Sequence, residues 1–155
     1  MTLTLVAIGI AMACVMVLVS VKRGRNRNEL ERHSISAEQL ESLMASGQKV
    51  LLYDVRQALD LLAYPELILG AQRIPPEEVL KTPSPLPRDK DIIVYCTCPG
   101  DKTSRSVLRR ALTLGFTRIQ FLTGGLAAWK AKGYPVEPYR ESFRLSIPTV
   151  APPAG

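Results

Sequence analysis

The longest apolar pattern in the chain lies at its N-terminus. Residues 2–21 contain no charged side chain and only three Thr or Ser residues. At 1.5 Å per residue, a helix of this length crosses a hydrocarbon layer about 30 Å thick. The pattern therefore predicts a transmembrane anchor over residues 1–21. A cleaved signal peptide or a lipidated Cys14 is the alternative, but the run lacks the basic leader of such signals.

The pattern becomes basic directly after this run. Lys22, Arg23, Arg25 and Arg27 follow it, whereas no basic side chain precedes it. By the positive-inside rule, the N-terminus lies outside and the rest of a single-pass membrane protein lies in the cytoplasm. We predict that residues 22–33 form a basic tether between the membrane and a folded domain.

Beyond the tether, short apolar runs alternate with amphipathic segments. Ser36 and Gln39 have the spacing of a capping box, and Ile35 and Leu40 that of a hydrophobic staple, so a helix is expected to follow. Helical periodicity and runs of strand-forming residues predict the other elements. The expected helices are 37–46, 104–114 and 126–131, and the expected strands are 50–55, 92–95 and 119–122.

The remaining segments give weaker signals. They indicate a helical turn at 58–63, a short strand with a turn at 68–71, and a helix start at 75–78. Residues 81–90 contain three prolines and are expected to form a loop. Strands that alternate with helices predict an α/β domain, over residues 34–138, with a parallel sheet covered on both faces. Residues 139–155 are expected to form an irregular, proline-containing tail.

The formal net charge of +6 comes from two segments. Residues 22–32 hold five basic and two acidic side chains, where anionic lipid headgroups would attract them. Residues 96–118 hold five basic and one acidic side chain around two cysteines, which suggests an anionic substrate. Aromatic residues do not interleave with this charge, so we expect no nucleic-acid partner.

Those two cysteines, Cys96 and Cys98, lie where a buried strand gives way to a basic helix. Unpaired N–H groups and the helix dipole favour a thiolate at such a position. The only histidine, His33, precedes the domain, so no Cys–His nucleophile pair is expected there. Activation must instead come from backbone amides, the dipole and the nearby Lys102 and Arg105.

Five landmarks of this domain, in this order and spacing, resemble those of a single-domain rhodanese. They are Asp54-Val55-Arg56, Gly70-Ala71 with Ile74-Pro75, Val94-Tyr95-Cys96, Leu114-Gly115-Phe116, and Leu122-Thr123-Gly124-Gly125 with Trp129. The resemblance spans residues 36–138. It implies a five-stranded parallel sheet flanked by helices, and a catalytic cysteine that accepts sulfane sulfur as a persulfide and passes it to a thiophilic acceptor.

The chain departs from the family pattern in having two loop cysteines. The strand ending Val-Tyr-Cys points to Cys96 as the nucleophile, whereas the five residues before Ser104 point to Cys98, so both are candidate catalytic residues. Either could resolve the other's persulfide as a disulfide partner, or one could be a small buried residue. The expected substrate-binding residues are Gly100, Lys102, Thr103, Ser104 and Arg105.

Other residues of the domain are expected to support this site. Asp54 and Arg56 are predicted to form a buried or half-buried ion pair that braces the site, and Trp129 is predicted to pack in the core. Arg105 could equally lie on a solvated helix face. No metal site is expected because tetrahedral zinc needs four ligands, and we expect no cofactor.

The sequence thus predicts a membrane-anchored sulfurtransferase with thiosulfate or a protein persulfide as donor. Its partners would be a small anionic sulfur donor or a partner-protein thiol. A non-enzymatic rhodanese-like module that binds a membrane partner or delivers sulfur to it is the alternative. A phosphatase of the same fold is disfavoured because Arg105 follows Cys98 after six residues, not five.

Overall fold

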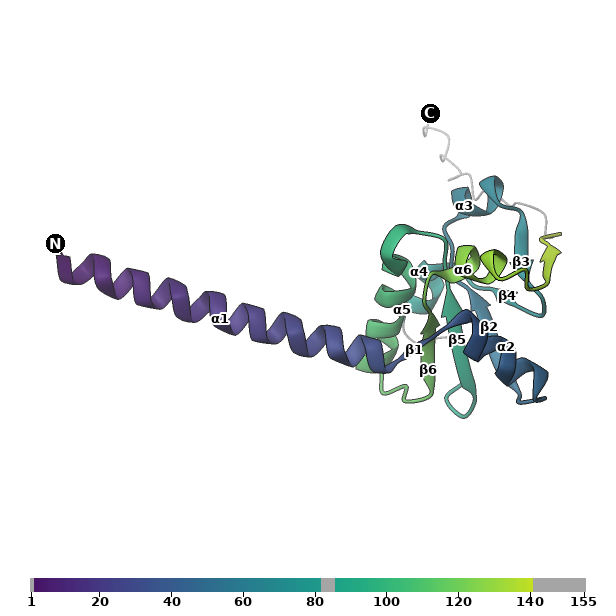
Figure 1. The fold of residues 1–155 in the computed structure, drawn as a ribbon, viewed down its shortest axis with the longest axis horizontal. Coiled ribbons are helices and arrows are strands. Elements are labelled where there is room, and N and C mark those ends of the chain that lie inside the picture. Colours follow the sequence, from purple (N-terminus) through teal and green to yellow (C-terminus); the bar gives the residue numbers. More distant parts are fainter. Residues whose placement is uncertain (1, 82–85, 141–155) are drawn as a thin grey trace, which may run out of the picture.

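The computed structural model describes residues 2–81 and 86–140. A long helix, α1 (Thr2–Arg32), projects away from an α/β domain formed by the rest of the described chain (Figure 1). Over the described residues, no helix combines the length and apolar character that a membrane span requires. Of the tail predicted at 139–155, residues 141–155 lie outside the described residues.

The centre of the domain is a five-stranded sheet in the order β1-β6-β5-β2-β4 (Figure 1). Every neighbouring pair is parallel, which confirms the predicted five-stranded parallel sheet. The three longer strands match the sequence prediction, whereas β1 and β4 have two residues each and no detectable pattern. The strands are β1 (Ser34–Ile35), β2 (Val50–Asp54), β4 (Gln72–Arg73), β5 (Asp91–Tyr95) and β6 (Ile119–Leu122).

A second, two-stranded sheet lies beside the first. It pairs β3 (Glu66–Ile68) with β7 (Val136–Pro138) in antiparallel fashion. The sequence indicated a short strand near Ile68 but gave no signal for β7. This pairing brings the end of the described chain to the residue before β3, where the backbone N–H of Tyr139 donates to the carbonyl of Pro65 at 2.9 Å.

Helices cover both faces of the main sheet, as predicted. Along β5, Ile92 and Val94 face one core cluster, while Ile93 and Tyr95 face the other. The first cluster includes residues of α4 and α5, and the second includes residues of α2 and α6. The helices are α2 (Ala37–Ala45), α3 (Ala58–Ala63), α4 (Pro76–Leu80), α5 (Lys102–Thr113) and α6 (Gly125–Ala131).

Helix α2 begins as the sequence predicted. The N–H of Gln39 donates to the Ser36 Oγ at 3.2 Å, and the N–H of Ser36 donates to the Gln39 Oε1 at 2.9 Å. Ile35 and Leu40 are buried in the same cluster, as a hydrophobic staple requires. Trp129 is also buried there, which confirms that it packs in the core.

The segment predicted as a basic tether is helical to Arg32 and already contacts the domain near its end. Leu30 is buried in the cluster that includes α5. The His33 Nδ1 lies 2.9 Å from the carbonyl oxygen of Ile119, and the N–H of Phe121 donates to the His33 carbonyl at 2.8 Å. The single histidine therefore helps to dock the edge strand β1 onto β6.

Candidate functional site

The candidate site is the loop that joins β5 to α5. Cys96, Thr97 and Cys98 follow the strand, and a short 3-10 turn (Pro99–Asp101) leads into the helix. Gly100 and Asp101 both have left-handed backbone angles, with φ of 68° and 54°. Such angles are unusual for a residue other than glycine, so a tertiary contact must hold Asp101 there.

That contact is made by the Asp101 carboxylate. Its Oδ2 accepts a hydrogen bond from the N–H of Gly124 at 3.0 Å, and the side chain is buried. Asp101 thereby ties the cysteine loop to the turn before α6. Sequence reasoning missed this residue: an Asp directly before a helix start suggests an N-cap, but this carboxylate makes no capping hydrogen bond and its partner is distant in the sequence.

The two sulfur atoms of the loop lie side by side but differ in exposure. The Cys96 side chain is buried, with only 1% of its surface exposed, whereas Cys98 is half-buried. Their Sγ atoms are 2.8 Å apart, within hydrogen-bond distance. The Cys98 Sγ also accepts the N–H of Thr103 at 3.2 Å and lies 3.4 Å from the Thr103 Oγ1. Cys98 thus contacts the first turn of α5 through Thr103, and Cys96 contacts it through Ser104.

These contacts move the pKa values of the two thiols in opposite directions. Burial, followed by the hydrogen bond to Cys98, raises the pKa of the Cys96 thiol to about 11. Burial also opposes ionisation of Cys98, but hydrogen bonds from the Cys96 thiol and from Thr103 outweigh it and lower the pKa of Cys98. The negative charge therefore belongs on Cys98 and the proton on Cys96.

Helix α6 contacts the same loop through its backbone. The N–H of Leu126 donates to the carbonyl of Cys96 at 3.1 Å. A Cβ atom at Gly125 would lie only 1.8 Å from that carbonyl oxygen, so this position admits only glycine. The Gly124-Gly125 pair therefore serves the site directly, because it lets α6 press against the cysteine backbone.

Asp54 and Arg56 form a fully buried ion pair after β2. The Arg56 Nε donates to the Asp54 Oδ2 at 2.7 Å, and the guanidinium also donates to the carbonyls of Tyr64 and Glu66 at 2.9 and 2.6 Å. This arrangement holds the segment from α3 to β3 against the carboxyl end of the sheet. The pair acts as a structural brace, and its donors are directed to protein oxygens.

The predicted substrate-binding residues separate into two groups. Gly100, Lys102 and Thr103 belong to the loop or the first turn of α5, and Lys102 is exposed. Ser104 is fully buried, and its hydroxyl and backbone N–H face the Cys96 thiol, where they oppose the rise of its pKa.

Arg105 departs from the expectation of a solvated helix face. Its guanidinium carbon lies 4.8 Å from the centre of the Phe121 ring, and the side chain is half-buried against β6. The reason is that Phe121 belongs to the face of the sheet that α5 covers, so a cation–π contact is available there.

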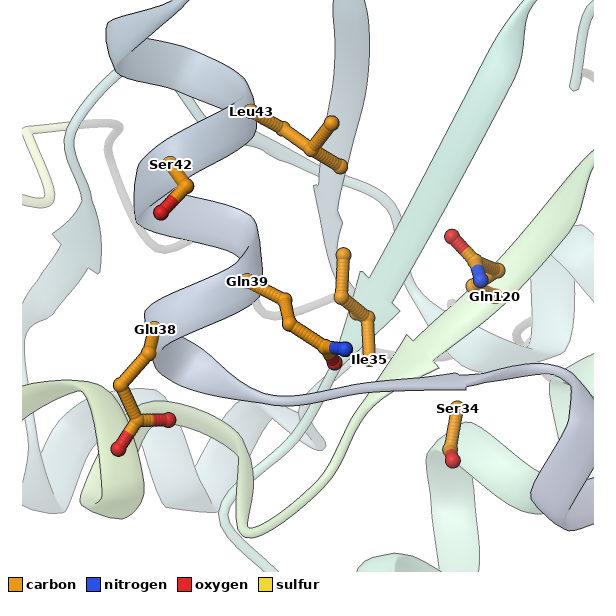
Figure 2. Close-up of a pocket in the computed structure, with 7 residues that line it drawn as sticks. All are labelled: Ser34, Ile35, Glu38, Gln39, Ser42, Leu43 and Gln120. Atoms are coloured by element: carbon orange, nitrogen blue, oxygen red, sulfur yellow. The ribbon is translucent and has the colours of Figure 1, made fainter.

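Two hollows flank the loop. One, of about 220 Å³, is lined by residues that include Gln57, Lys102 and Thr103. The other, of about 250 Å³, is lined by residues that include Tyr64, Thr97 and Leu126. A larger hollow of about 470 Å³ lies between β1 and α2, and none of its lining residues comes from the cysteine loop (Figure 2).

The described residues contain no group of three or more His, Cys, Asp or Glu side chains that could hold a metal ion. The loop places a buried thiol with a raised pKa beside a half-buried thiol with a lowered pKa at the start of a helix. A parallel α/β sheet with such a loop between a central strand and a helix start places this chain in the class of α/β domains with a reactive-cysteine loop.

Comparison with known proteins agrees with this class. The family model of the rhodanese-like domain matches residues 36–132. The chain therefore belongs to the rhodanese-like family. A protein named sulfurtransferase from Allochromatium vinosum is 27% identical over 104 residues, which are 67% of this chain and 94% of that protein.

Solved structures give the same result. The rhodanese-like domain of the Alr3790 protein from Anabaena is 31% identical, with a TM-score of 0.58, over 79% of this chain and 86% of that one. A rhodanese-related protein from Thermoplasma volcanium is 28% identical, with a TM-score of 0.57, over 68% of this chain and 97% of that one.

Proposed function

We propose that this protein is a sulfurtransferase in which Cys98 takes up sulfane sulfur as a persulfide and passes it to a thiophilic acceptor. The observation that supports this most strongly is the position of the Cys98 Sγ, 3.2 Å from the Thr103 amide and 2.8 Å from the Cys96 thiol. Both groups stabilise negative charge on that one sulfur, and it is the more exposed of the two.

The transfer takes place in two displacements. The Cys98 thiolate attacks the outer sulfur of thiosulfate, the new S–S bond forms, and sulfite leaves with the electron pair of the broken bond. The N–H group that held the thiolate then faces the ionised persulfide. An acceptor thiolate or cyanide attacks the outer sulfur and restores the Cys98 thiolate.

A small anion fits the surroundings of the loop. The exposed Lys102 and the first turn of α5 carry positive charge, and the adjacent hollow of about 220 Å³ has room for a donor of this size. We propose thiosulfate or a protein persulfide as donor. The acceptor would be a small thiophile or a partner-protein thiol.

We further propose that α1 anchors the domain at a membrane, on the cytoplasmic side. The support is the uncharged run at residues 2–21 and the exposure of apolar side chains around the helix, such as Met12, Met16 and Leu18. A helix that is apolar all round needs an apolar medium or partner. A full-length protein that stays with membranes after alkaline carbonate extraction would agree. Release of the full-length protein by carbonate would contradict the anchor.

A binding or sulfur-carrier role without turnover is the second candidate. It is favoured by the exposed apolar side chains of α3, Leu59 and Leu62, together with Tyr64, which lines the same hollow as Thr97. Such side chains beside a reactive loop suit contact with a protein partner. Repeated turnover with small substrates would argue against this role.

The test uses the full-length protein in detergent micelles with thiosulfate and cyanide, and it measures thiocyanate. Wild type should form thiocyanate over many turnovers. Cys98→Ser should abolish the reaction, whereas Cys96→Ser should retain it because the hydroxyl still donates to Cys98. Full activity of Cys98→Ser would overturn the assignment of Cys98.

A further inference from the structure

We propose that Cys96 is a resolving residue: it attacks the Cys98 persulfide within the same loop, releases its outer sulfur as sulfide and leaves a Cys96–Cys98 disulfide. This rests on the proposed function, because it needs the persulfide on Cys98. It adds a second outcome to that chemistry, the reductive release of hydrosulfide when no acceptor arrives.

The placement of the two sulfurs supports the step. The Sγ atoms are 2.8 Å apart across a single intervening residue, Thr97, so the attacking atom already touches the sulfur it must attack. Groups held in contact react far faster than groups that must diffuse together. The Cys96 carbonyl is fixed by the N–H of Leu126, which keeps this cysteine in place while Cys98 reacts.

The proton balance also fits. An ionised persulfide cannot expel a doubly charged sulfide, so the leaving sulfur needs a proton. Cys96 supplies it because its thiol is protonated in the resting site. Cys96 Sγ bonds to Cys98 Sγ, the bond between Cys98 Sγ and the outer sulfur breaks, and the outer sulfur leaves as HS⁻ with the Cys96 proton. The Cys96 sulfur is oxidised from a thiol to a disulfide sulfur and the outer sulfur is reduced to hydrosulfide, while the Cys98 sulfur keeps the oxidation level it has in the persulfide.

Burial divides the roles between the two thiols. Cys96 is only 1% exposed, so an external donor or thiol has little access to it. Cys98 is the reachable sulfur at both stages: it takes sulfur from the donor, and it is the disulfide sulfur that an external dithiol reductant can attack. A disulfide between cysteines separated by one residue closes a strained ring, which favours its reduction. An external dithiol thus returns both cysteines to thiols.

The experiment is a single turnover without reductant or acceptor. Full-length Cys14→Ser protein in detergent micelles is mixed with thiosulfate, so that Cys96 and Cys98 are the chain's only cysteines. Hydrosulfide is trapped with a fluorogenic probe, and the intact mass is followed with time. The matched variant adds Cys96→Ser. We expect about one hydrosulfide per chain and a final mass about 2 Da below the dithiol form. The Cys96→Ser variant should hold a persulfide, about 32 Da heavier, and release at least tenfold less hydrosulfide.

Two other results are informative. If the protein with both loop cysteines keeps the 32 Da gain as long as the Cys96→Ser variant and releases no hydrosulfide, the resolving role is wrong while the proposed function stands. If neither protein gains 32 Da, both proposals are wrong. Hydrosulfide release whose rate rises with protein concentration would show attack by a second chain and would also overturn the intramolecular step.

Discussion

Replacement of Gly125 by alanine tests whether α6 holds the cysteine loop by direct backbone contact. The new Cβ would lie 1.8 Å from the Cys96 carbonyl oxygen, whereas such contacts are essentially never under 3.0 Å, so the two segments must separate by at least 1.2 Å (3.0 minus 1.8). The hydrogen bond from Leu126 to Cys96, now 3.1 Å long, would be lost.

The expected cost has three parts. Overpacking costs about 1–3 kcal/mol, the lost hydrogen bond about 0.5–1.5 kcal/mol, and the left-handed backbone about 1–2 kcal/mol. The total of about 2.5–6.5 kcal/mol is a large share of a typical domain stability of about 5–15 kcal/mol. Gly47→Ala is the matched control, because Gly47 is also left-handed but a Cβ added there would have nothing within 4 Å. It should cost only about 1–2 kcal/mol.

Urea unfolding in detergent micelles, followed by the fluorescence of Trp129, measures both variants. Trp129 is the only tryptophan of the chain and lies in α6 itself. Gly125→Ala should lose at least about 1.5 kcal/mol more than Gly47→Ala, because only Gly125→Ala overpacks and breaks a hydrogen bond. Equal losses would refute the contact of α6 with the Cys96 backbone as the source of the cost.

Four further predictions address the rest of the site. Asp54→Asn leaves the buried Arg56 without its carboxylate, so the free energy of unfolding measured in urea should fall by about 3–5 kcal/mol. Lys102→Ala, at the exposed start of α5, should cost under about 1 kcal/mol. Equal costs would contradict the role of the Asp54–Arg56 pair as a structural brace. Because its pKa is lowered, Cys98 should stay a thiolate below the pH at which an ordinary thiol protonates, so iodoacetamide alkylation in a Cys14→Ser background should inflect at a lower pH than alkylation of a free cysteine. Cys96→Ala should move that inflection to higher pH and Cys96→Ser should largely keep it; no movement in Cys96→Ala would show that Cys96 does not stabilise the thiolate. Lys102→Ala should raise the KM for thiosulfate several-fold. Arg105→Ala should leave this KM unchanged and lower the stability by about 1–2 kcal/mol, because the contact with Phe121 is lost. A raised KM in Arg105→Ala with an unchanged KM in Lys102→Ala would place the anion at Arg105.

Much of the fold could be predicted because its longer elements have strong local signals. The capping box at Ser36 and the apolar runs of β2, β5 and β6 act through neighbours in the sequence, and the structure has each of them. The strands β1, β4 and β7 have two or three residues and are set by partners far along the chain. No local pattern specifies such elements.

The candidate site was likewise predictable only where the signal is local in the sequence. The sequence placed both cysteines at a helix start, but the strand and the helix favoured different ones. Their environments depend on contacts that the sequence does not display: the Thr103 amide on Cys98, and the carbonyl contact that holds Cys96 on α6. Asp101 was missed, and Arg105 was misplaced, because their partners Gly124 and Phe121 lie more than ten residues away in the sequence.

The position of the persulfide tests the central claim most directly. The full-length protein in detergent micelles is treated with thiosulfate, alkylated to trap persulfides, digested and analysed by tandem mass spectrometry of the peptide that contains Cys96 and Cys98. In the Cys96→Ser variant, where the persulfide is not resolved, the extra sulfur of about 32 Da should lie on Cys98. An extra sulfur on Cys96 in the Cys98→Ser variant, with none on Cys98 in the Cys96→Ser variant, would contradict the account.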